Sequence, residues 1–144
     1  MLTLKRMFSF CASHRLFNPN FSDEKNHSIF GKCSGKNGHG HNYKLEVVVS
    51  GHIDPETGML FNLQTLKQLV NEYIINDVDH KHLNHDVSWL QGKIPTTEVL
   101  VESIWERLEL KLKDEKITLI QLESITVWET ENNIVTKTKN ESKY

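Results

Sequence analysis

His39 and His41 are separated by a single residue, Gly40, at the start of a segment that alternates between polar and apolar residues. Side chains two positions apart on a β-strand point to the same face, with Cα atoms about 7 Å apart. Two imidazoles at that spacing can converge on one metal ion about 2 Å from each ring nitrogen. The alternative is a polar strand end with two surface histidines, and so short a pattern does not decide between the two.

A third imidazole, His14, lies just after residues 3–12, a segment whose alternation is typical of a strand. An antiparallel pairing of the two segments could bring His14 level with His39 and His41. Three neutral histidines with one open position are typical of a catalytic zinc site, because a structural site uses four protein ligands. The sequence therefore predicts a zinc site formed by these three residues, although spacing alone does not bring His14 to the pair.

Groups that could move protons lie elsewhere in the chain. Cys33 is six residues before His39, and beside a dication its pKa would fall, so that the thiolate could act as base or nucleophile. An inert loop thiol and a fourth zinc ligand are the competing interpretations. Asp79 and His80 form an adjacent carboxylate–imidazole pair, which is typical of a tuned acid or base but also occurs in solvated loops.

Four further residues can be interpreted from their positions in the sequence. A buried Glu129, directly after the apolar segment 125–128, could bind two adjacent N–H donors of a planar heterocycle, as carboxylates bind arginine; a surface glutamate is the alternative. His82 and His85, with His80, could form a separate metal site on spacing alone. Cys11 is expected on the strand face opposite His14, pointing into the core.

The elements that must position these residues follow from the periodicity. Alternation predicts strands at 3–12 and 41–49, and closing strands are expected at 117–128 and 134–138. A helical period begins after Asn62, a plausible N-cap, and a second helix opens at residues 96–98. The polar stretch 18–38 reads as a long loop, which is uncommon in compact domains and usually functional or disordered. This order predicts an α+β fold with an antiparallel sheet.

Composition limits the classes of partner. A length of 144 residues suits one domain, residues 1–144, and a net charge of −2 with a pI near 6.4 provides no basic field for nucleic acid. The apolar stretches are too short to span a bilayer, and residues 1–17 lack the pattern of a signal peptide. Two cysteines make a disulfide framework improbable. We therefore expect a cytoplasmic protein without a nucleic-acid or membrane partner.

Several motifs together resemble the 6-pyruvoyltetrahydropterin synthase family. They run in the family's order over nearly the whole chain: FCASHRL (10–16), FGKC (30–33), GHGHNY (38–43), IDPETGM (53–59), VDHK (78–81), TTE (96–98) and WET (128–130). The resemblance implies an α+β T-fold, with a four-stranded antiparallel sheet and two helices on one face. It also implies that sheets of several copies pair into a β-barrel, in a homohexamer built as a dimer of trimers with active sites between subunits.

The resemblance implies a role for each matching residue. His14, His39 and His41 match the zinc ligands, Cys33, Asp79 and His80 match the catalytic set, and Glu129, Thr96 and Thr97 match positions that bind the pterin. The implied lyase reaction converts 7,8-dihydroneopterin triphosphate, the small-molecule substrate, into 6-pyruvoyltetrahydropterin and inorganic triphosphate, in tetrahydrobiopterin biosynthesis. Zinc would act as a Lewis acid on the substrate's side-chain oxygens, so that Cys33 can remove and return a proton. Arg15 and Lys32 are candidates for holding the triphosphate.

Two alternatives stay open. Five residues separate Cys33 from His39, which resembles the tetrahydrobiopterin branch, whereas the 6-carboxytetrahydropterin synthases of the queuosine pathway typically have three. A more remote alternative is a zinc- and pterin-binding module without turnover, although such a module would not need a base beside the metal. Cys11, His82 and Asn84 depart from the family pattern, which bears on fine tuning rather than on the mapped catalytic residues.

Overall fold

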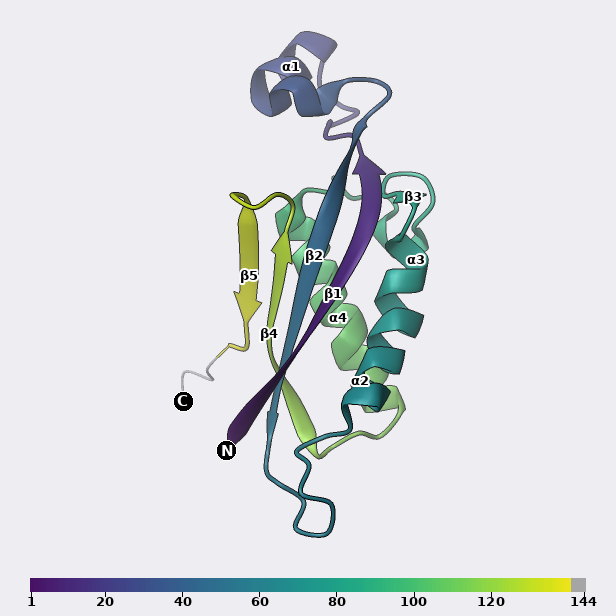
Figure 1. The fold of residues 1–144 in the computed structure, drawn as a ribbon. Helices are drawn as coiled ribbons and strands as arrows, with labels where there is room; N and C mark the ends of the chain where they lie inside the picture. Colours follow the sequence, from purple (N-terminus) through teal and green to yellow (C-terminus); the bar gives the residue numbers. More distant parts are fainter. Residues whose placement is uncertain (141–144) are drawn as a thin grey trace.

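A computed structural model of the chain describes residues 1–140, and its frame is one five-stranded sheet in the order β3-β1-β2-β4-β5 (Figure 1). Four strands pair antiparallel, and the two-residue β3 runs parallel to β1, so the sheet is mixed. The strand bounds are β1 Leu2–His14, β2 His39–Gly51, β3 Lys81–His82, β4 Ile120–Trp128 and β5 Ile134–Thr138.

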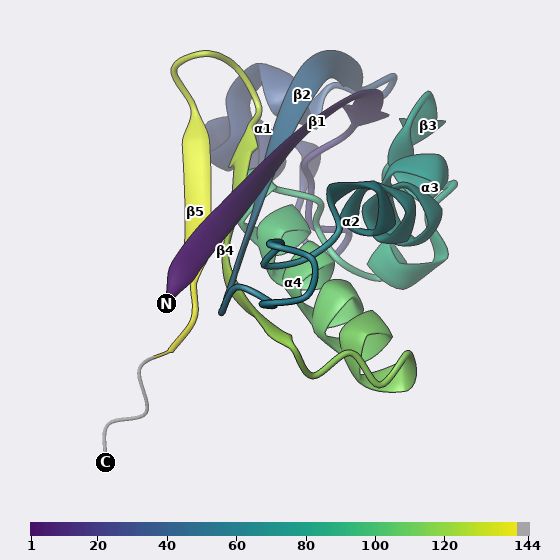
Figure 2. The same cartoon turned by 60° about the horizontal axis from the view of Figure 1, so that its bottom comes forward.

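Two helical segments cover one face of the sheet and leave the other face free of helices (Figures 1 and 2). The first begins with α2 (Leu63–Val70), passes through the π-helical η2 (Asn71–Ile75) and ends with α3 (Asn76–Val78). The second is α4 (Thr97–Asp114). Asn62 and Thr96 cap the two segments, as their side-chain oxygens accept backbone N–H groups of the first turn.

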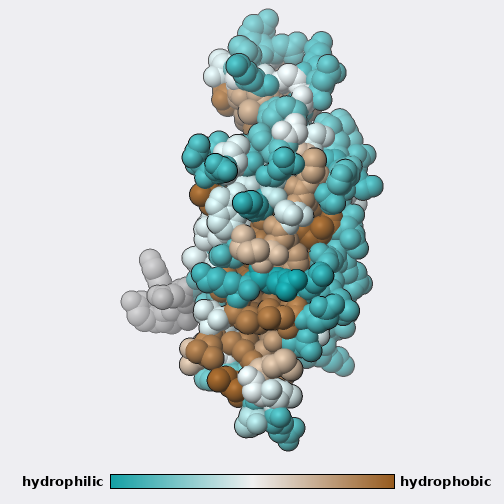
Figure 3. Space-filling view, in the orientation of Figure 1, coloured by the Kyte–Doolittle hydropathy of each residue, from teal (hydrophilic) through white to brown (hydrophobic). Residues whose placement is uncertain are grey.

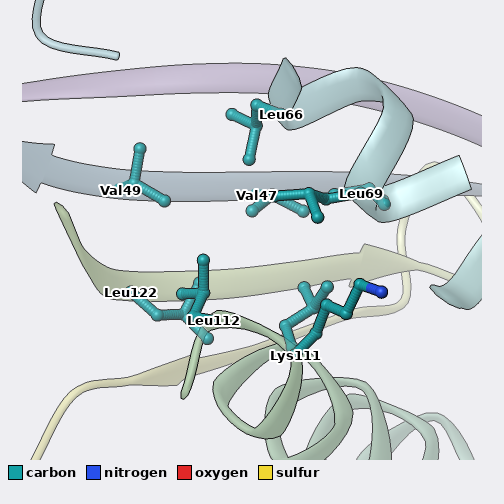
Figure 4. Close-up of a pocket in the computed structure, with 9 residues that line it drawn as sticks. Val47, Val49, Leu66, Leu69, Lys111, Leu112 and Leu122 are labelled. Carbon is teal, nitrogen blue, oxygen red and sulfur yellow. The ribbon is translucent and has the colours of Figure 1, made fainter. Parts of the chain in front are cut away.

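The core lies between the sheet and these helices. Alternate residues of β2, from Tyr43 to Val49, are buried against α4, whose inward face carries Leu100, Ile104 and Leu108. A small apolar pocket remains in this layer (Figure 4). Lys111 is the charged residue in its lining, and its ammonium group forms an ion pair with Glu115 at 2.9 Å. The pocket is therefore a packing feature without groups for chemistry. Among the described residues, no helix is long and apolar enough to cross a membrane.

The α+β class is confirmed, with several corrections to the predicted elements. The sheet has a fifth strand because β3 adds to the β1 edge, where Lys81 and His82 pair with Ala12 and Ser13. The polar stretch 18–38 is not simply a loop: it contains α1 (Asp23–Phe30), capped by Ser22, and the 3-10 turn η1 (Gly31–Ser34), and it projects beyond the end of the sheet (Figure 1).

Cys11 was predicted to face the core, and this is wrong. It does lie on the face opposite His14, but that face of β1 is the one without helices, so Cys11 is exposed while Phe10 and Ala12 are buried. Both strands of the central pair also extend further than predicted, and β1 reaches His14 while β2 already begins at His39. All three histidines therefore lie within regular strand pairing.

Gly38 makes the tight approach from η1 into β2 possible. It has a φ of +68°, and a Cβ atom at this position would lie 2.6 Å from the backbone oxygen of His14. We expect Gly38→Ala to cost about 1–3 kcal/mol of unfolding free energy for backbone strain. Because the clash displaces the start of β2 from His14, we also expect at least about tenfold weaker metal binding, or some 1.4 kcal/mol.

Urea unfolding and competition with a chelator measure the two effects. Gly58→Ala is the matched control, because Gly58 has a similar φ of +72° but open space where the Cβ atom would lie. This control should lose stability through strain alone and keep its metal affinity. Equal metal affinity in both variants would contradict the interpretation.

Candidate metal and catalytic site

The register of β1 and β2 brings three imidazoles together. His14 pairs directly with His39, and His41 pairs with Ala12, two residues before His14. The ring centroids lie 4.9 Å apart for His14 and His39, 5.1 Å for His14 and His41, and 4.8 Å for His39 and His41. One nitrogen from each ring lies within 4.8 Å of the others, so the cluster can bind a metal ion.

The protonation state of His14 fits a metal ligand. Its Nδ1 lies 2.9 Å from the carbonyl oxygen of Pro95, a contact in which Nδ1–H donates. The Nε2 lone pair then remains for a metal, in the arrangement by which backbone carbonyls orient metal-binding histidines. His14 is fully buried, and this burial lowers its pKa, which favours the neutral form that binds metals.

Two buried nitrogens support the same conclusion. Among the described residues, His14 Nε2 and His41 Nε2 are the buried side-chain polar atoms that have no hydrogen-bond partner. A buried polar atom without a hydrogen bond costs free energy. Two such nitrogens in one histidine cluster therefore indicate that a metal ion binds there. Burial also lowers the pKa of His41, against an opposing effect of the Glu129 carboxylate. The chemistry of the three donors suits zinc, which binds neutral imidazole well.

Glu129 lies beside this cluster, directly after β4. One carboxylate oxygen, Oε1, is 3.8 Å from His41 Nε2, and the other, Oε2, accepts a hydrogen bond of 2.8 Å from the Thr97 hydroxyl. The Glu129 side chain is 17% exposed and lies where two surface hollows meet. Thr96 and Thr97 line one hollow, and Gly40, His41 and Trp128 line the other. The carboxylate can therefore bind a ligand that reaches the metal cluster.

The two threonines have different contacts. Thr97 contacts Glu129 directly, at the first residue of α4. The Thr96 hydroxyl accepts the Val99 N–H at 3.2 Å and so serves as the cap of α4, although its residue lines the same hollow. Thr97 thus orients the carboxylate, and the role of Thr96 as a pterin-binding residue stays a prediction.

Cys33 lies in η1, on the chain that leads from α1 into β2. Its carbonyl oxygen accepts the Leu16 N–H at 2.8 Å, which ties η1 to the segment directly after β1. Partial burial, with a further effect of the negative Glu129, raises the pKa of the Cys33 thiol. At neutral pH the group is therefore a thiol in the metal-free protein, and a nearby dication would act in the opposite direction.

Asp79 and His80 lie apart from these residues. Asp79 Oδ1 accepts the Cys11 N–H at 2.9 Å and lies 3.1 Å from His80 Nδ1. The Cys11 N–H, followed by His80, lowers the pKa of Asp79. The His80 ring is 81% exposed, and within residues 1–140 no hydrogen bond or ion pair joins either residue to Cys33 or to the histidine cluster. The structure thus divides the predicted catalytic set into two groups.

The alternative of a separate metal site at His80, His82 and His85 is not supported by the described residues. The rings of His82 and His85 stack at 4.3 Å instead of converging, and the His14 cluster is the one group of metal-binding side chains that the described residues bring together. Sequence reasoning also missed Pro95, which orients His14 through its carbonyl. A backbone carbonyl has no residue-type signature, so no signal in the sequence could have identified it.

Comparison with known proteins identifies the family of the chain. The family model of 6-pyruvoyl tetrahydropterin synthase matches residues 3–140. The chain belongs to the 6-pyruvoyl tetrahydropterin synthase family. It is 46% identical to human 6-pyruvoyl tetrahydrobiopterin synthase over 92% of this chain and 88% of that protein. The corresponding Dictyostelium discoideum protein is 42% identical, over 94% and 93%. The structure of Caenorhabditis elegans 6-pyruvoyl tetrahydropterin synthase superposes with a TM-score of 0.86 at 34% identity, covering 96% of each chain.

The buried histidines predict how the stability of the metal-free protein depends on pH. The folded-state pKa values of His14 and His41 lie below their ordinary value of 6.5, so below that pH the unfolded chain takes up protons that the folded chain does not. The free energy of unfolding should therefore decrease as the pH falls through and below 6.5.

Thermal unfolding of chelator-treated protein between about pH 8 and 5 measures this dependence. His14→Gln should unfold with a shallower loss of stability, because one buried imidazole is gone. His52→Gln, which removes an exposed histidine, serves as the control and should keep the wild-type slope. A wild-type slope in His14→Gln would assign the pH dependence to other groups.

Proposed function

We infer that this protein is a lyase that converts 7,8-dihydroneopterin triphosphate into 6-pyruvoyltetrahydropterin and releases inorganic triphosphate. The observation that carries this proposal is the juxtaposition of the His14, His39 and His41 cluster with the Glu129 carboxylate on a chain of this family. A metal site and a carboxylate held by Thr97 can bind the two ends of a pterin that bears a side chain. The five-residue interval between Cys33 and His39 favours this branch over 6-carboxytetrahydropterin synthase.

In the proposed reaction, His14, His39 and His41 hold zinc, which when bound polarises the side-chain oxygens of the substrate and acidifies the neighbouring C–H groups. Glu129 binds the N–H donors of the pterin ring through both carboxylate oxygens, and Thr97 fixes its orientation. Cys33 takes the proton from the substrate carbon and later returns it. Asp79 holds the His80 imidazole, which exchanges the second proton.

We propose that a second copy of the chain brings Asp79 and His80 to the metal site, in a hexamer built as a dimer of trimers. The exposed His80 ring lies on the β1 edge, where residues 1–140 offer it no hydrogen-bond or ion-pair partner but Asp79. The helix-free face of the sheet carries apolar groups at its surface, including Met7 at 49% exposure (Figure 3). Burial of that face between copies would remove apolar area from water and form the β-barrel.

The location and remaining partners follow from the same residues. Cys11 and Cys33 are both free, and the proposed role of Cys33 requires a reduced thiol, which favours the cytoplasm. The proposal needs the pterin triphosphate, zinc and further copies of the chain, and it involves no nucleic acid or membrane.

Mass spectrometry of the products from zinc-loaded protein and 7,8-dihydroneopterin triphosphate tests the function. We expect 6-pyruvoyltetrahydropterin and triphosphate, and a loss of at least about 100-fold in kcat for Cys33→Ala, because a general base typically contributes that much. Cys33→Ala should keep its zinc and its pterin affinity. Cys11→Ser, which replaces the other free cysteine, is the matched control and should stay active.

Other products would decide between the alternatives. Formation of 6-carboxytetrahydropterin and acetaldehyde would replace the proposal by the queuosine branch. Binding of pterin without turnover would favour the binding module, and unchanged activity of Cys33→Ala would remove Cys33 from the mechanism.

A mixing experiment tests the shared active site. Cys33→Ala and His80→Ala should each be inactive alone, because each removes one half of the proton-transfer set. When the two are unfolded, mixed in equal amounts and refolded, about a quarter of the sites in the mixed oligomers receive both native residues. Activity should return to about that level. Persistent inactivity of the mixture, in oligomers shown to contain both variants, would place both residues in the same chain's site.

A further inference from the structure

Asn84, in the turn after β3, makes two hydrogen bonds to the backbone of a single residue. Its Oδ1 accepts the Arg15 N–H at 2.8 Å, and its Nδ2 donates to the Arg15 carbonyl at 2.8 Å. These bonds continue the pairing of β3 with β1, which ends with Leu83 N–H donating to the Ser13 carbonyl at 2.7 Å. A side-chain amide thus extends the sheet beyond its last strand residue, in the position of a backbone peptide group.

Arg15, which Asn84 holds, and the residue after it are hydrogen-bonded to the turn that contains Cys33. Arg15 Nε donates to the Ser34 carbonyl at 2.9 Å, and the next residue, Leu16, donates its N–H to the Cys33 carbonyl at 2.8 Å. The guanidinium also lies 3.9 Å from the centre of the Phe17 ring, which restricts its rotamers. The position of η1 relative to β1 therefore depends on where Asn84 holds Arg15.

Asn84 is itself fixed on both sides. Its backbone N–H donates to His82 Nδ1 at 3.2 Å, and its carbonyl accepts from Gln91 Nε2 at 3.2 Å. The turn is closed by Asp86, whose carboxylate accepts the His82 N–H at 2.9 Å. The amide therefore acts from a rigid support, and its separate oxygen and nitrogen accept from the Arg15 N–H and donate to the Arg15 carbonyl at once.

The metal cluster does not depend on this clamp. His14 is held by its register with His39 and by the Pro95 carbonyl, neither of which involves Asn84. Removal of the Asn84 amide should therefore release η1 without releasing the metal ligands. This difference separates a specific effect on Cys33 from a general loss of structure.

We propose that Asn84 is a positioning residue that sets the place of the Cys33 thiol relative to the His14, His39 and His41 cluster. Its consequence for turnover rests on the proposed function, whereas its effect on the Cys33 turn does not. The clamp acts through Arg15 and Leu16, which link Asn84 to η1.

Alkylation of the zinc-loaded protein with iodoacetamide tests the clamp, and peptide mass spectrometry reads Cys33 and Cys11 separately. In Asn84→Ala we expect the rate at Cys33, relative to that at Cys11, to rise about tenfold, as expected when two hydrogen bonds that hold the turn are lost. We expect kcat to fall by a similar factor, with zinc content unchanged. The matched control is Gln91→Ala, which removes a side-chain amide that contacts Asn84 but not Arg15.

Because Gln91 supports Asn84 but does not contact Arg15, the control should change the alkylation ratio and kcat by a clearly smaller factor than Asn84→Ala does. An unchanged ratio in Asn84→Ala, or an equal change in Gln91→Ala, would overturn the proposal. If Asn84→Ala is not folded by circular dichroism, Asn84→Asp keeps the acceptor for Arg15 N–H and should shift both quantities in the same direction by a smaller factor. The alkylation ratio needs no substrate, so a wild-type protein without lyase activity would refute the proposed function while the clamp is still tested.

Discussion

The pairing of His14 with His39 is the contact on which the site depends. β1 and β2 are paired over thirteen positions, from Leu2 with Gly51 to His14 with His39. A shift of one residue would turn the side chains of one strand to the other face, because successive residues alternate. The imidazoles would then lie on opposite faces of the sheet, and the metal cluster would not exist.

The hydrophobic core fixes that register. Phe10 and Ala12 on β1 and Tyr43 and Leu45 on β2 are all buried on the face that carries the three histidines. A slipped register would expose these side chains to water at a cost of about 25 cal/mol per Å² of apolar surface. The apolar pattern of the strands therefore positions the metal ligands, and Tyr43 also contacts His14 directly, with its hydroxyl 3.5 Å from Nδ1. The same burial keeps His14 neutral, so the core also sets the protonation state of the site.

Local patterns predicted the parts of the fold that depend on local rules. The alternation of β2, the cap Asn62 and the start of a helix at residues 96–98 were confirmed, because periodicity and capping act within a few residues. Cys11 was wrongly expected in the core. Alternation gives the relative orientation of two side chains, but it does not tell which face of the sheet the helices cover. β3 and the clamp by Asn84 could not be predicted, because both are pairings between residues far apart in sequence, with no preference in the residues themselves. His14, in contrast, was assigned from a possible antiparallel pairing of the two strands and again from the family resemblance, and the register does place it opposite His39.

The conformation of His80 also argues that one chain holds only part of the machinery. His80 has a φ of 60°, in the left-handed region, which costs a residue other than glycine about 1–2 kcal/mol. Its backbone N–H bonds the Cys11 carbonyl at 2.6 Å, and this bond fixes the ring in an exposed position beside Asp79. Within residues 1–140, the strained backbone does not bring the imidazole into a buried position, and no hydrogen bond or ion pair links it to Cys33. A residue in this region persists when the surrounding structure supports it, and the proposal that His80 serves the site of a second copy would account for its exposed ring.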